Sequence, residues 1–430
     1  MKHVILGAGP AGVIAAETIR KHAPRDDIVI VGDEPESPYS RMAIPYLLIG
    51  HVGEEGTHLR HGAGHFDKLG IVVKRGIRAQ AVDVNARTVT LGDGSTLRYD
   101  RLLIATGASP ASPPIPGIHA AGVHPCWTLK DARAIDQLAG KGARVLQMGA
   151  GFIGCIIMEA LAARGVQLTV VEMGDRMVPR MMGPTAGGMI KDWCEKQGVR
   201  VFTGTRVEAI EAQAPEGTQV TRSGLRVRLS NGQQLECDLV ISATGVKPNI
   251  GFLENSGVTC LLGVLTDEHM QTNVAGVYAA GDCAEAFDKV SGKMIVSAIQ
   301  PNAAEQARVA ALNMAGQQAE LRGVTQINVL DTLGLISASF GRWEGVPGGE
   351  HVERSDEDNF RYIRLEFDGD VLVGSNCVGL TQHVGLLRGL TESRVKLGSW
   401  KQALMRDPLQ LPQAYLASAQ AQHARNARAA

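Results

Sequence analysis

The stretch HVILGAGPAG at residues 3–12 decides the fold of this chain. Its apolar, β-branched start is typical of a buried strand, and it leads directly into Gly7, Gly9 and Gly12. Such a GxGxxG turn lets the backbone approach a pyrophosphate, while the N-terminus of the next helix, with about half a positive charge, faces the anion. The stretch therefore predicts a strand, a dinucleotide-binding turn and a helix.

The same pattern occurs again in RVLQMGAGFIG at residues 144–154, where Gly149, Gly151 and Gly154 form the turn. In each copy a second apolar strand ends in an acid, and a later apolar strand runs into Ala-Thr-Gly. The matching segments are DIVIVGDE (27–34) with QLTVVE (167–172), and RLLIATGASP (101–110) with DLVISATGVKP (238–248). Gly7 to Gly107 spans 100 residues and Gly149 to Gly245 spans 96. This repeat predicts two tandem Rossmann-like domains of α/β class.

Each copy also contains a turn dipeptide between alternating strands, Asp93-Gly94 in the first and Asn231-Gly232 in the second. Both predict a β-hairpin. The proline-rich stretch SPASPPIPG at 109–117 predicts a hinge between the two copies. From about residue 324 the segments become β-rich, which indicates a third domain ending near Pro412, followed by a tail that we expect to be a frayed helix or disordered.

An acid at the end of the second strand accepts hydrogen bonds from a ribose diol. Glu172 follows Gly149 by 23 residues and has this place in the second copy. In the first copy Glu34 is the first choice and Asp33 the second. The charge of Glu172 would repel a 2′-phosphate and so favours NADH over NADPH, although the nearby Arg176 and Arg180 could soften that preference.

Composition excludes several classes of function. Lys plus Arg total 43 and Asp plus Glu 44, so no like-signed field exists to attract nucleic acid or an anionic membrane. No apolar run reaches the length of a membrane span. An apolar strand follows Met1-Lys2-His3 at once, and the seven cysteines are scattered without metal-ligand spacing, so we expect a cytoplasmic protein without a metal site. Four histidines between 51 and 65 (His51, His58, His61, His65) are expected to be solvated.

The segment TNVAGVYAAGDCAEA at 272–286 resembles the second flavin-binding segment of the FAD-dependent pyridine nucleotide-disulfide oxidoreductase superfamily. With both glycine turns and both Ala-Thr-Gly turns, the resemblance covers roughly residues 1–320. It implies that the first unit binds FAD, that the second binds NAD(H), and that the chain returns to complete the FAD domain before an α+β interface domain. The expected domains are 1–114 with 246–323 for FAD, 115–245 for NAD(H), 324–412 for the interface and 413–430 for the tail.

By this resemblance Asp282 of the Gly281-Asp282 pair hydrogen-bonds the flavin ribityl chain, and Thr106 and Gly107 lie near FAD. The implied FAD-binding residues are Gly7, Gly9, Gly12, Asp33, Glu34, Arg41, Thr106, Gly107, Gly281, Asp282 and Asn302. The implied NAD-binding residues are Gly149, Gly151, Phe152, Ile153, Gly154, Glu172 and Gly245.

Asn302 and Glu305 have the spacing of a capping box, which predicts a helix that begins at Asn302. In the resembled family, the positive end of this helix faces the pyrimidine edge of the isoalloxazine, where negative charge collects on reduction.

The chain departs from the thiol-using members of this family. In SPYSRMAIPYLL (37–48), Met42 stands where coenzyme A-disulfide reductases and NADH oxidases have a redox-active cysteine. The CxxxxC pair and the C-terminal His-Pro motif of the glutathione-reductase-like branch are missing, and Ile156 stands where that branch usually has Glu. We therefore expect no catalytic group beyond the flavin. Cys155 and Cys283, each beside a dinucleotide motif, are expected to be small buried hydrophobes.

Without thiols, the chain resembles the ferredoxin and rubredoxin reductases, which pass electrons between NADH and an iron protein. The stretch GLTQHVGLLRGL at 379–390 is similar to the NAD(H)-reacting flavin subunits of tungsten aldehyde oxidoreductases and phenylglyoxylate dehydrogenases. This implies an iron–sulfur partner and an oligomer or hetero-complex built through the C-terminal domain, with His383 a candidate for contact near the flavin. A peroxide-forming NADH oxidase and a flavin-bearing scaffold or sensor remain as alternatives.

Overall fold

The computed structural model describes residues 1–62, 64–213 and 224–429, and the side chains up to residue 420. The chain forms two compact units. Unit 1 contains Met1–Ala111 and Val246–Thr325, and unit 2 contains Ser112–Gly245 and Gln326–Ala430. In the part of the chain that is described, no helix is both long and apolar enough to cross a membrane.

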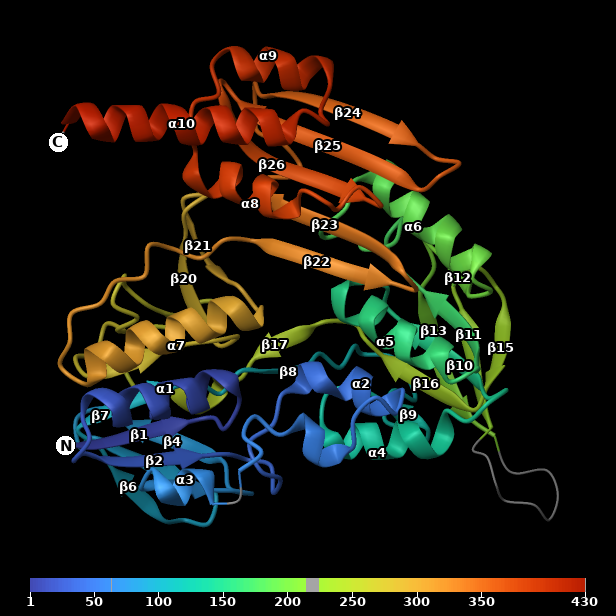
Figure 1. The fold of residues 1–430 in the computed structure, drawn as a ribbon. Helices are drawn as coiled ribbons and strands as arrows, with labels where there is room; N and C mark the ends of the chain where they lie inside the picture. Colours follow the sequence, from blue (N-terminus) through green and yellow to red (C-terminus); the bar gives the residue numbers. More distant parts are fainter. Residues whose placement is uncertain (63, 214–223, 430) are drawn as a thin grey trace. The chain divides into compact units, whose positions relative to one another are not determined.

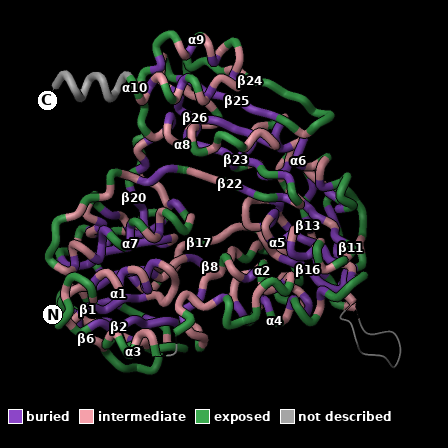
Figure 2. Tube along the Cα trace, in the orientation of Figure 1, coloured by how far each residue is buried: buried purple, intermediate pink, exposed green. Residues whose placement is uncertain are grey.

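Unit 1 is built on a five-stranded parallel sheet in the order β19-β7-β1-β2-β3. Its strands are β1 (Lys2–Leu6), β2 (Asp27–Val31), β3 (Ile71–Lys74), β7 (Arg101–Ile104) and β19 (Val277–Ala279). The inner strands are buried because other elements of unit 1 cover the sheet, and Val82, Val89 and Leu91, which lie outside it, belong to the same hydrophobic core. Figure 2 shows β1 and β2 in the colour of buried residues. Helices α1 (Pro10–His22) and α7 (Gln300–Met314) pack side by side (Figure 1).

Smaller elements complete unit 1. A three-stranded antiparallel sheet is formed by β4 (Ala79–Asp83), β5 (Thr88–Leu91) and β6 (Thr96–Arg98). Another contains β18 (Val264–Leu265), β20 (Ala284–Asp288) and β21 (Lys293–Val296), and β8 (Ala108–Pro110) pairs with β17 (Val246–Pro248). The short helices are η1 (Arg41–Ala43), α2 (Ile44–Leu48), η2 (Glu54–Thr57), α3 (His65–Lys68) and η3 (Gly251–Leu253).

Unit 2 contains the second parallel sheet, in the order β12-β11-β10-β16-β9. Its strands are β9 (Val123–His124), β10 (Arg144–Met148), β11 (Gln167–Val171), β12 (Arg200–Phe202) and β16 (Leu239–Ser242), with helices α4 (Leu129–Leu138), α5 (Phe152–Ala163) and α6 (Pro184–Lys196). An antiparallel sheet is made of β13 (Val207–Ala212), β14 (Leu225–Leu229) and β15 (Gln234–Cys237). The two predicted hairpins, β5–β6 and β14–β15, are confirmed.

The C-terminal part of unit 2 is a five-stranded antiparallel sheet in the order β22-β23-β26-β25-β24. Its strands are β22 (Ile327–Thr332), β23 (Leu335–Gly341), β24 (Glu350–Asp356), β25 (Arg361–Asp368) and β26 (Val371–Val378). Helices α8 (Val384–Ser393), α9 (Ser399–Arg406) and α10 (Leu411–Ala429) cover this sheet (Figure 1). On its other side β22 contacts α5 and β26 contacts α6, so this sheet packs against the second parallel sheet's helices.

The predicted capping box at Asn302 is wrong. Helix α7 begins at Gln300 with Ile299 as its N-cap residue, because Pro301 suits the first turn, where an N–H has no helical partner anyway. The Asn302 side chain instead donates to Ser297 Oγ at 2.7 Å, and Glu305 pairs with Arg308 at 2.7 Å.

The glycine turn and the Ala-Thr-Gly turn meet at the carboxyl ends of adjacent strands in each unit. In unit 1 a Cβ on Gly7 would overlap the Ala105 carbonyl oxygen, and a Cβ on Gly12 would overlap that of Gly7. In unit 2 a Cβ on Gly149 would likewise overlap the carbonyl oxygen of Ala243. These glycines are required because backbone lies where a side chain would begin.

We predict that Gly12→Ala lowers the apparent Tm of the protein. The added methyl group meets backbone that cannot rotate away, so the cost should reach or exceed the ~1–3 kcal/mol typical of overpacking. Gly188→Ala is the matched control, because a Cβ there meets no described atom within 4 Å and the site is helical. Thermal unfolding of both variants checks the prediction, and equal Tm values would contradict it.

Candidate dinucleotide-binding sites

The helices that follow the two glycine turns begin without a side-chain cap. Gly9 is the N-cap residue of α1 and Gly151 that of α5, and no described side chain accepts their first N–H groups. Helix α4 differs, since Thr128 and Asp131 cap it with a full capping box. The free N–H groups at Phe152 and Ile153 and at the start of α1 suit an anion, so both turns fit a pyrophosphate.

The middle glycine of each turn is open. A Cβ on Gly9 or on Gly151 would meet no described atom within 4 Å, whereas Gly154, like Gly12, is closed off by the backbone of its own turn. Both turns therefore have two glycines required by the fold and one that leaves room for a ligand. This division fits a dinucleotide at each of the two turns.

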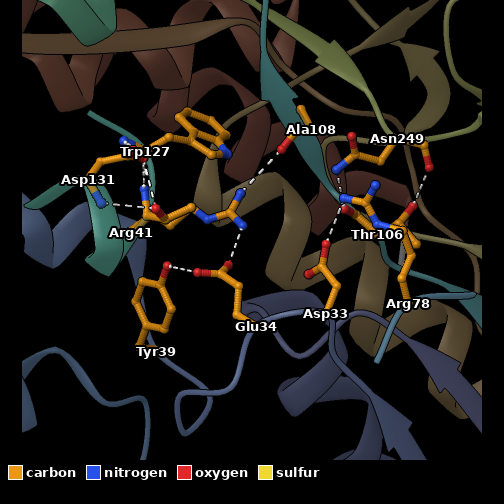
Figure 3. A network of polar contacts seen from close by, with 11 residues as sticks. Asp33, Glu34, Tyr39, Arg41, Arg78, Thr106, Ala108, Trp127, Asp131 and Asn249 are labelled. Atoms are coloured by element: carbon orange, nitrogen blue, oxygen red, sulfur yellow. Dashed lines mark hydrogen bonds and ion pairs between the residues drawn. The ribbon is translucent and has the colours of Figure 1, made fainter. Parts of the chain in front are cut away.

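The acid at the end of β2 is held by its own unit. Glu34 accepts from Arg41 Nη2 at 2.7 Å and from the Tyr39 hydroxyl at 2.6 Å (Figure 3). Arg41 also donates to the Ala108 carbonyl oxygen at 3.2 Å. Burial opposes the charge on Arg41, but the bond with Glu34 outweighs it and raises the pKa of the guanidinium. Glu34 is thus fixed in place as an acceptor, with Arg41 as a cation beside it.

The second choice for the ribose acid, Asp33, lies in a different environment. It pairs with Arg78 at 2.9 Å, and both side chains are largely exposed (Figure 3). A screened surface pair of this kind contributes little. Glu34 stays the first choice, because two described side chains fix its position whereas Asp33 lies in an exposed pair.

Asp282 is an unpartnered acid in unit 1. Its side chain is half-buried, and no described residue donates a hydrogen bond to it. Burial raises the pKa of the carboxyl, and the charge of Arg41 only partly offsets this effect. The neighbouring Gly281 N–H is taken by Gln306 Oε1 at 2.7 Å. An acceptor left without a donor beside an ordered turn fits the hydroxyl groups of a flavin ribityl chain.

The first Ala-Thr-Gly turn is joined to the strand that returns from the second copy. The Thr106 hydroxyl donates to the Asn249 carbonyl oxygen at 2.8 Å, and the Asn249 amide donates to the Thr106 carbonyl oxygen at 2.9 Å (Figure 3). The Asn249 N–H donates to the Gly107 carbonyl oxygen at 2.9 Å. The Thr106 side chain therefore holds the turn, while Gly107, with a φ of +64° and open space at its Cβ position, leaves the backbone approachable.

Asn302 lies in the first turn of α7. Its amide is used within unit 1, since it donates to Ser297 Oγ and to the Thr325 carbonyl oxygen. The N-terminus of α7 has no side-chain cap among the described residues. Its backbone N–H groups, more than the Asn302 side chain, are thus the groups that suit a negative charge.

In unit 2, Glu172 organises the nucleotide turn from the end of β11. Its Oε2 accepts from the Ala150 N–H and its Oε1 from the Gly174 N–H, each at 2.7 Å. Each carboxylate oxygen can accept further bonds, so a ribose diol can still donate to it. Gly245, with a φ of +110°, closes the second Ala-Thr-Gly turn and has open space at its Cβ position.

The two arginines after Glu172 are in different positions. Arg176 donates to the Met182 carbonyl oxygen at 2.8 Å and pairs with Asp175 at 2.7 Å, so its own loop holds it. Arg180 is exposed. Arg176 is therefore less available to neutralise the charge of a 2′-phosphate.

Side chains that the sequence left open are also placed. His65 binds Glu17 at 2.8 Å, and the described residues contain no group of three or more His, Cys, Asp or Glu able to hold a metal ion. All seven cysteines are free thiols, and Cys155 and Cys283 are completely buried. Met42 is 49% exposed. His383 is the exposed N-cap residue of α8 in unit 2, and its contact with the flavin stays a prediction.

Sequence reasoning missed three side chains that hold unit 1 together. Tyr39 contacts Glu34 within one loop, and Asn249 contacts Thr106, which is distant in sequence. No spacing rule predicts either contact. Gln306 could have been found, because it shares the buried face of α7 with Ala303, Ala307 and Ala310. A glutamine on an apolar helix face needs a hydrogen-bond partner.

The chain belongs to the pyridine nucleotide-disulphide oxidoreductase family, whose model matches residues 1–316. The fold of two dinucleotide-binding domains agrees with this membership. The chain is therefore a flavoprotein oxidoreductase that uses FAD and NAD(H).

Two curated relatives and one solved structure resemble most of the chain. The epsilon subunit of NADH-dependent phenylglyoxylate dehydrogenase from Aromatoleum evansii is 34% identical and covers 86% of both chains. An NADH oxidase from Methanocaldococcus jannaschii is 31% identical over 74% of this chain and 71% of its own. The structure of a ferredoxin reductase from Rhodopseudomonas palustris has a TM-score of 0.78 at 25% identity, and covers 89% of this chain and 92% of its own.

We predict that Asp282→Ala weakens flavin retention, because the ribityl hydroxyls lose a charged acceptor worth roughly 1.5–3 kcal/mol. Dialysis against increasing urea, followed by the flavin absorbance per chain, measures the loss. Glu305→Ala is the control, since Glu305 lies half-exposed on α7 in the same unit. An Asp282 variant that keeps its flavin as firmly as the parent would refute the assignment.

We also predict that the protein prefers NADH to NADPH, because a 2′-phosphate would meet the Glu172 carboxylate. Glu172→Gln should lower the ratio of kcat/KM for NADH to kcat/KM for NADPH, mainly by raising the value for NADPH. Steady-state kinetics with both nucleotides check this. Equal or higher kcat/KM for NADPH in the parent protein would reverse the prediction.

Proposed function

We propose that this protein passes electrons between NAD(H) and an iron–sulfur protein that carries one electron at a time, without a thiol intermediate. In this proposal the first glycine turn, Glu34 and Asp282 hold FAD in unit 1. The second turn and Glu172 bind NAD(H) in unit 2. Residues 324–412 serve assembly with a twin or a different subunit in the cytoplasm.

The observation that carries the proposal is the state of the sulfur atoms. Burial raises the pKa of four thiols to about 12, which keeps them protonated near neutral pH. These are Cys126, Cys194, Cys237 and Cys377. Burial also raises the pKa of Cys155, Cys260 and Cys283. Met42, which is 49% exposed, carries a thioether, and a thioether cannot cycle between thiol and disulfide.

The residues of the chain would bind and orient the two nucleotides. The uncapped N-termini of α1 and α5 would bind pyrophosphates, Glu34 and Glu172 would accept from ribose hydroxyls, and α7 would place positive potential at its first turn. When bound, FAD supplies a centre that accepts two electrons as hydride and releases them singly. Direction is not fixed by this arrangement, since the same contacts suit NADH and NAD⁺.

The relatives support this proposal from two sides. One is a subunit of an NADH-dependent dehydrogenase, and the similar solved structure is a ferredoxin reductase. The NADH oxidase of Methanocaldococcus jannaschii favours the alternative in which oxygen accepts the electrons. Mixing the NADH-reduced protein with oxygen in a stopped-flow instrument separates the two. Reoxidation by oxygen that is as fast as turnover would favour the oxidase.

We predict that the purified protein reduces a one-electron dye with NADH and keeps most of that rate after alkylation of its accessible thiols. Reductive titration with NADH should consume two electrons per FAD. Uptake of four electrons, as expected for a flavin plus a disulfide, would refute the thiol-free route. So would a loss of dye reduction that follows the modification of one cysteine while the flavin stays bound.

A further inference from the structure

The loop of residues 173–183 connects the acid of the second nucleotide site to α6. It lies beside the glycine turn, since the Val178 N–H donates to the Ala150 carbonyl oxygen at 2.9 Å. The Ala150 N–H in turn donates to Glu172. The N–H of Ala150 is therefore bonded to Glu172, which follows β11, and its carbonyl oxygen is bonded to this loop. Val178 therefore links the loop directly to the turn.

Val178 is strained. Its φ is +49°, although it is β-branched and completely buried. A residue of this type in the left-handed region costs about 1–3 kcal/mol and persists only where its surroundings enforce the conformation. Its carbonyl oxygen accepts from the N–H groups of Met181 and Met182, each at 3.0 Å. The loop must therefore be held at its far end, or the strain would relax.

That far end is held by the C-terminal sheet. Asn376 Oδ1 accepts from the Gly183 N–H, and Asn376 Nδ2 donates to the Met181 carbonyl oxygen, both at 2.9 Å. The residue lies within β26, where it pairs with Ser339 on one side and Arg364 on the other. With 1% exposure, this polar side chain would be costly to bury unless its amide were satisfied, and the loop satisfies it. A sheet residue flanked by two strands is also a rigid anchor.

We propose that Asn376 is a positioning residue for NAD(H), and that it acts through the loop 173–183 on the turn at Ala150. The C-terminal sheet then does more than serve assembly: it sets the geometry of the second nucleotide site. This inference rests on the proposed binding of NAD(H) in unit 2. The contact between β26 and the loop is separate from the glycine motif and from the strand-end acid.

Asn376→Leu tests the proposal, because leucine has a similar volume but leaves Met181 and Gly183 without partners. The dissociation constant for NAD⁺, measured by titration of the FAD-loaded protein, should rise about tenfold, which corresponds to ~1.4 kcal/mol. The KM for NADH should rise with it, while kcat at saturating NADH changes little. Flavin content should stay at the parent level, because the substitution lies in unit 2.

Asn328→Leu on β22 is the matched control and should bind NAD⁺ like the parent, since among the described residues its side chain hydrogen-bonds only to Ser339 in the same sheet. If Asn376→Leu fails to fold, Asn376→Asp replaces it. Aspartate keeps the size and the acceptor for Gly183 but loses the donor to Met181, and NAD⁺ binding should still weaken.

A folded variant at position 376 that binds NAD⁺ within twofold of the parent would overturn the inference. A parent protein that retains FAD but binds neither NAD⁺ nor NADH would instead overturn the nucleotide site itself, and with it the inference. The two failures are distinguished by the parent titration alone.

Discussion

Both halves of this protein depend on backbone packed against backbone at the ends of parallel strands. The first glycine of each nucleotide turn sits against the carbonyl oxygen of an alanine in the Ala-Thr-Gly turn, Ala105 for Gly7 and Ala243 for Gly149. No side chain fits in either contact. Because two adjacent strands end there, the helix after the glycines must start at the sheet edge with its N–H groups directed outward. The positions of the two ligand sites follow from where these helices begin.

Sequence alone was enough to predict this architecture. The two glycine turns, the two Ala-Thr-Gly turns and the hairpin dipeptides are short-range patterns whose physical meaning does not depend on distant residues. They identified the two parallel sheets and the antiparallel hairpins. The family match over residues 1–316 agrees with what these patterns indicated.

The partners of the site residues could not be predicted in the same way. Glu34 was expected to face a ribose, but which cation would lie beside it depends on how the loop with Tyr39 and Arg41 folds back. The helix at 300 was misplaced because Pro301 outweighs a side-chain spacing that looked like a capping box. Asn376 is 204 residues from Glu172, and no local pattern connects a strand near the C-terminus with a nucleotide turn. Which distant segments hydrogen-bond to one another is decided only by how the folded chain packs.

The order of the segments along the chain has a consequence for synthesis. Unit 1 lacks β19 and α7 until residues 277–314 have been made, while all five strands of the second parallel sheet are present by Ser242. The second parallel sheet can therefore pair all its strands while the first still lacks its edge strand β19. This differs from the usual order, in which the N-terminal part folds first. Asn376 leaves the ribosome later still. On the proposed role of Asn376, the loop at Val178 waits for its anchor, and the second nucleotide turn takes its final form only when most of the chain already exists.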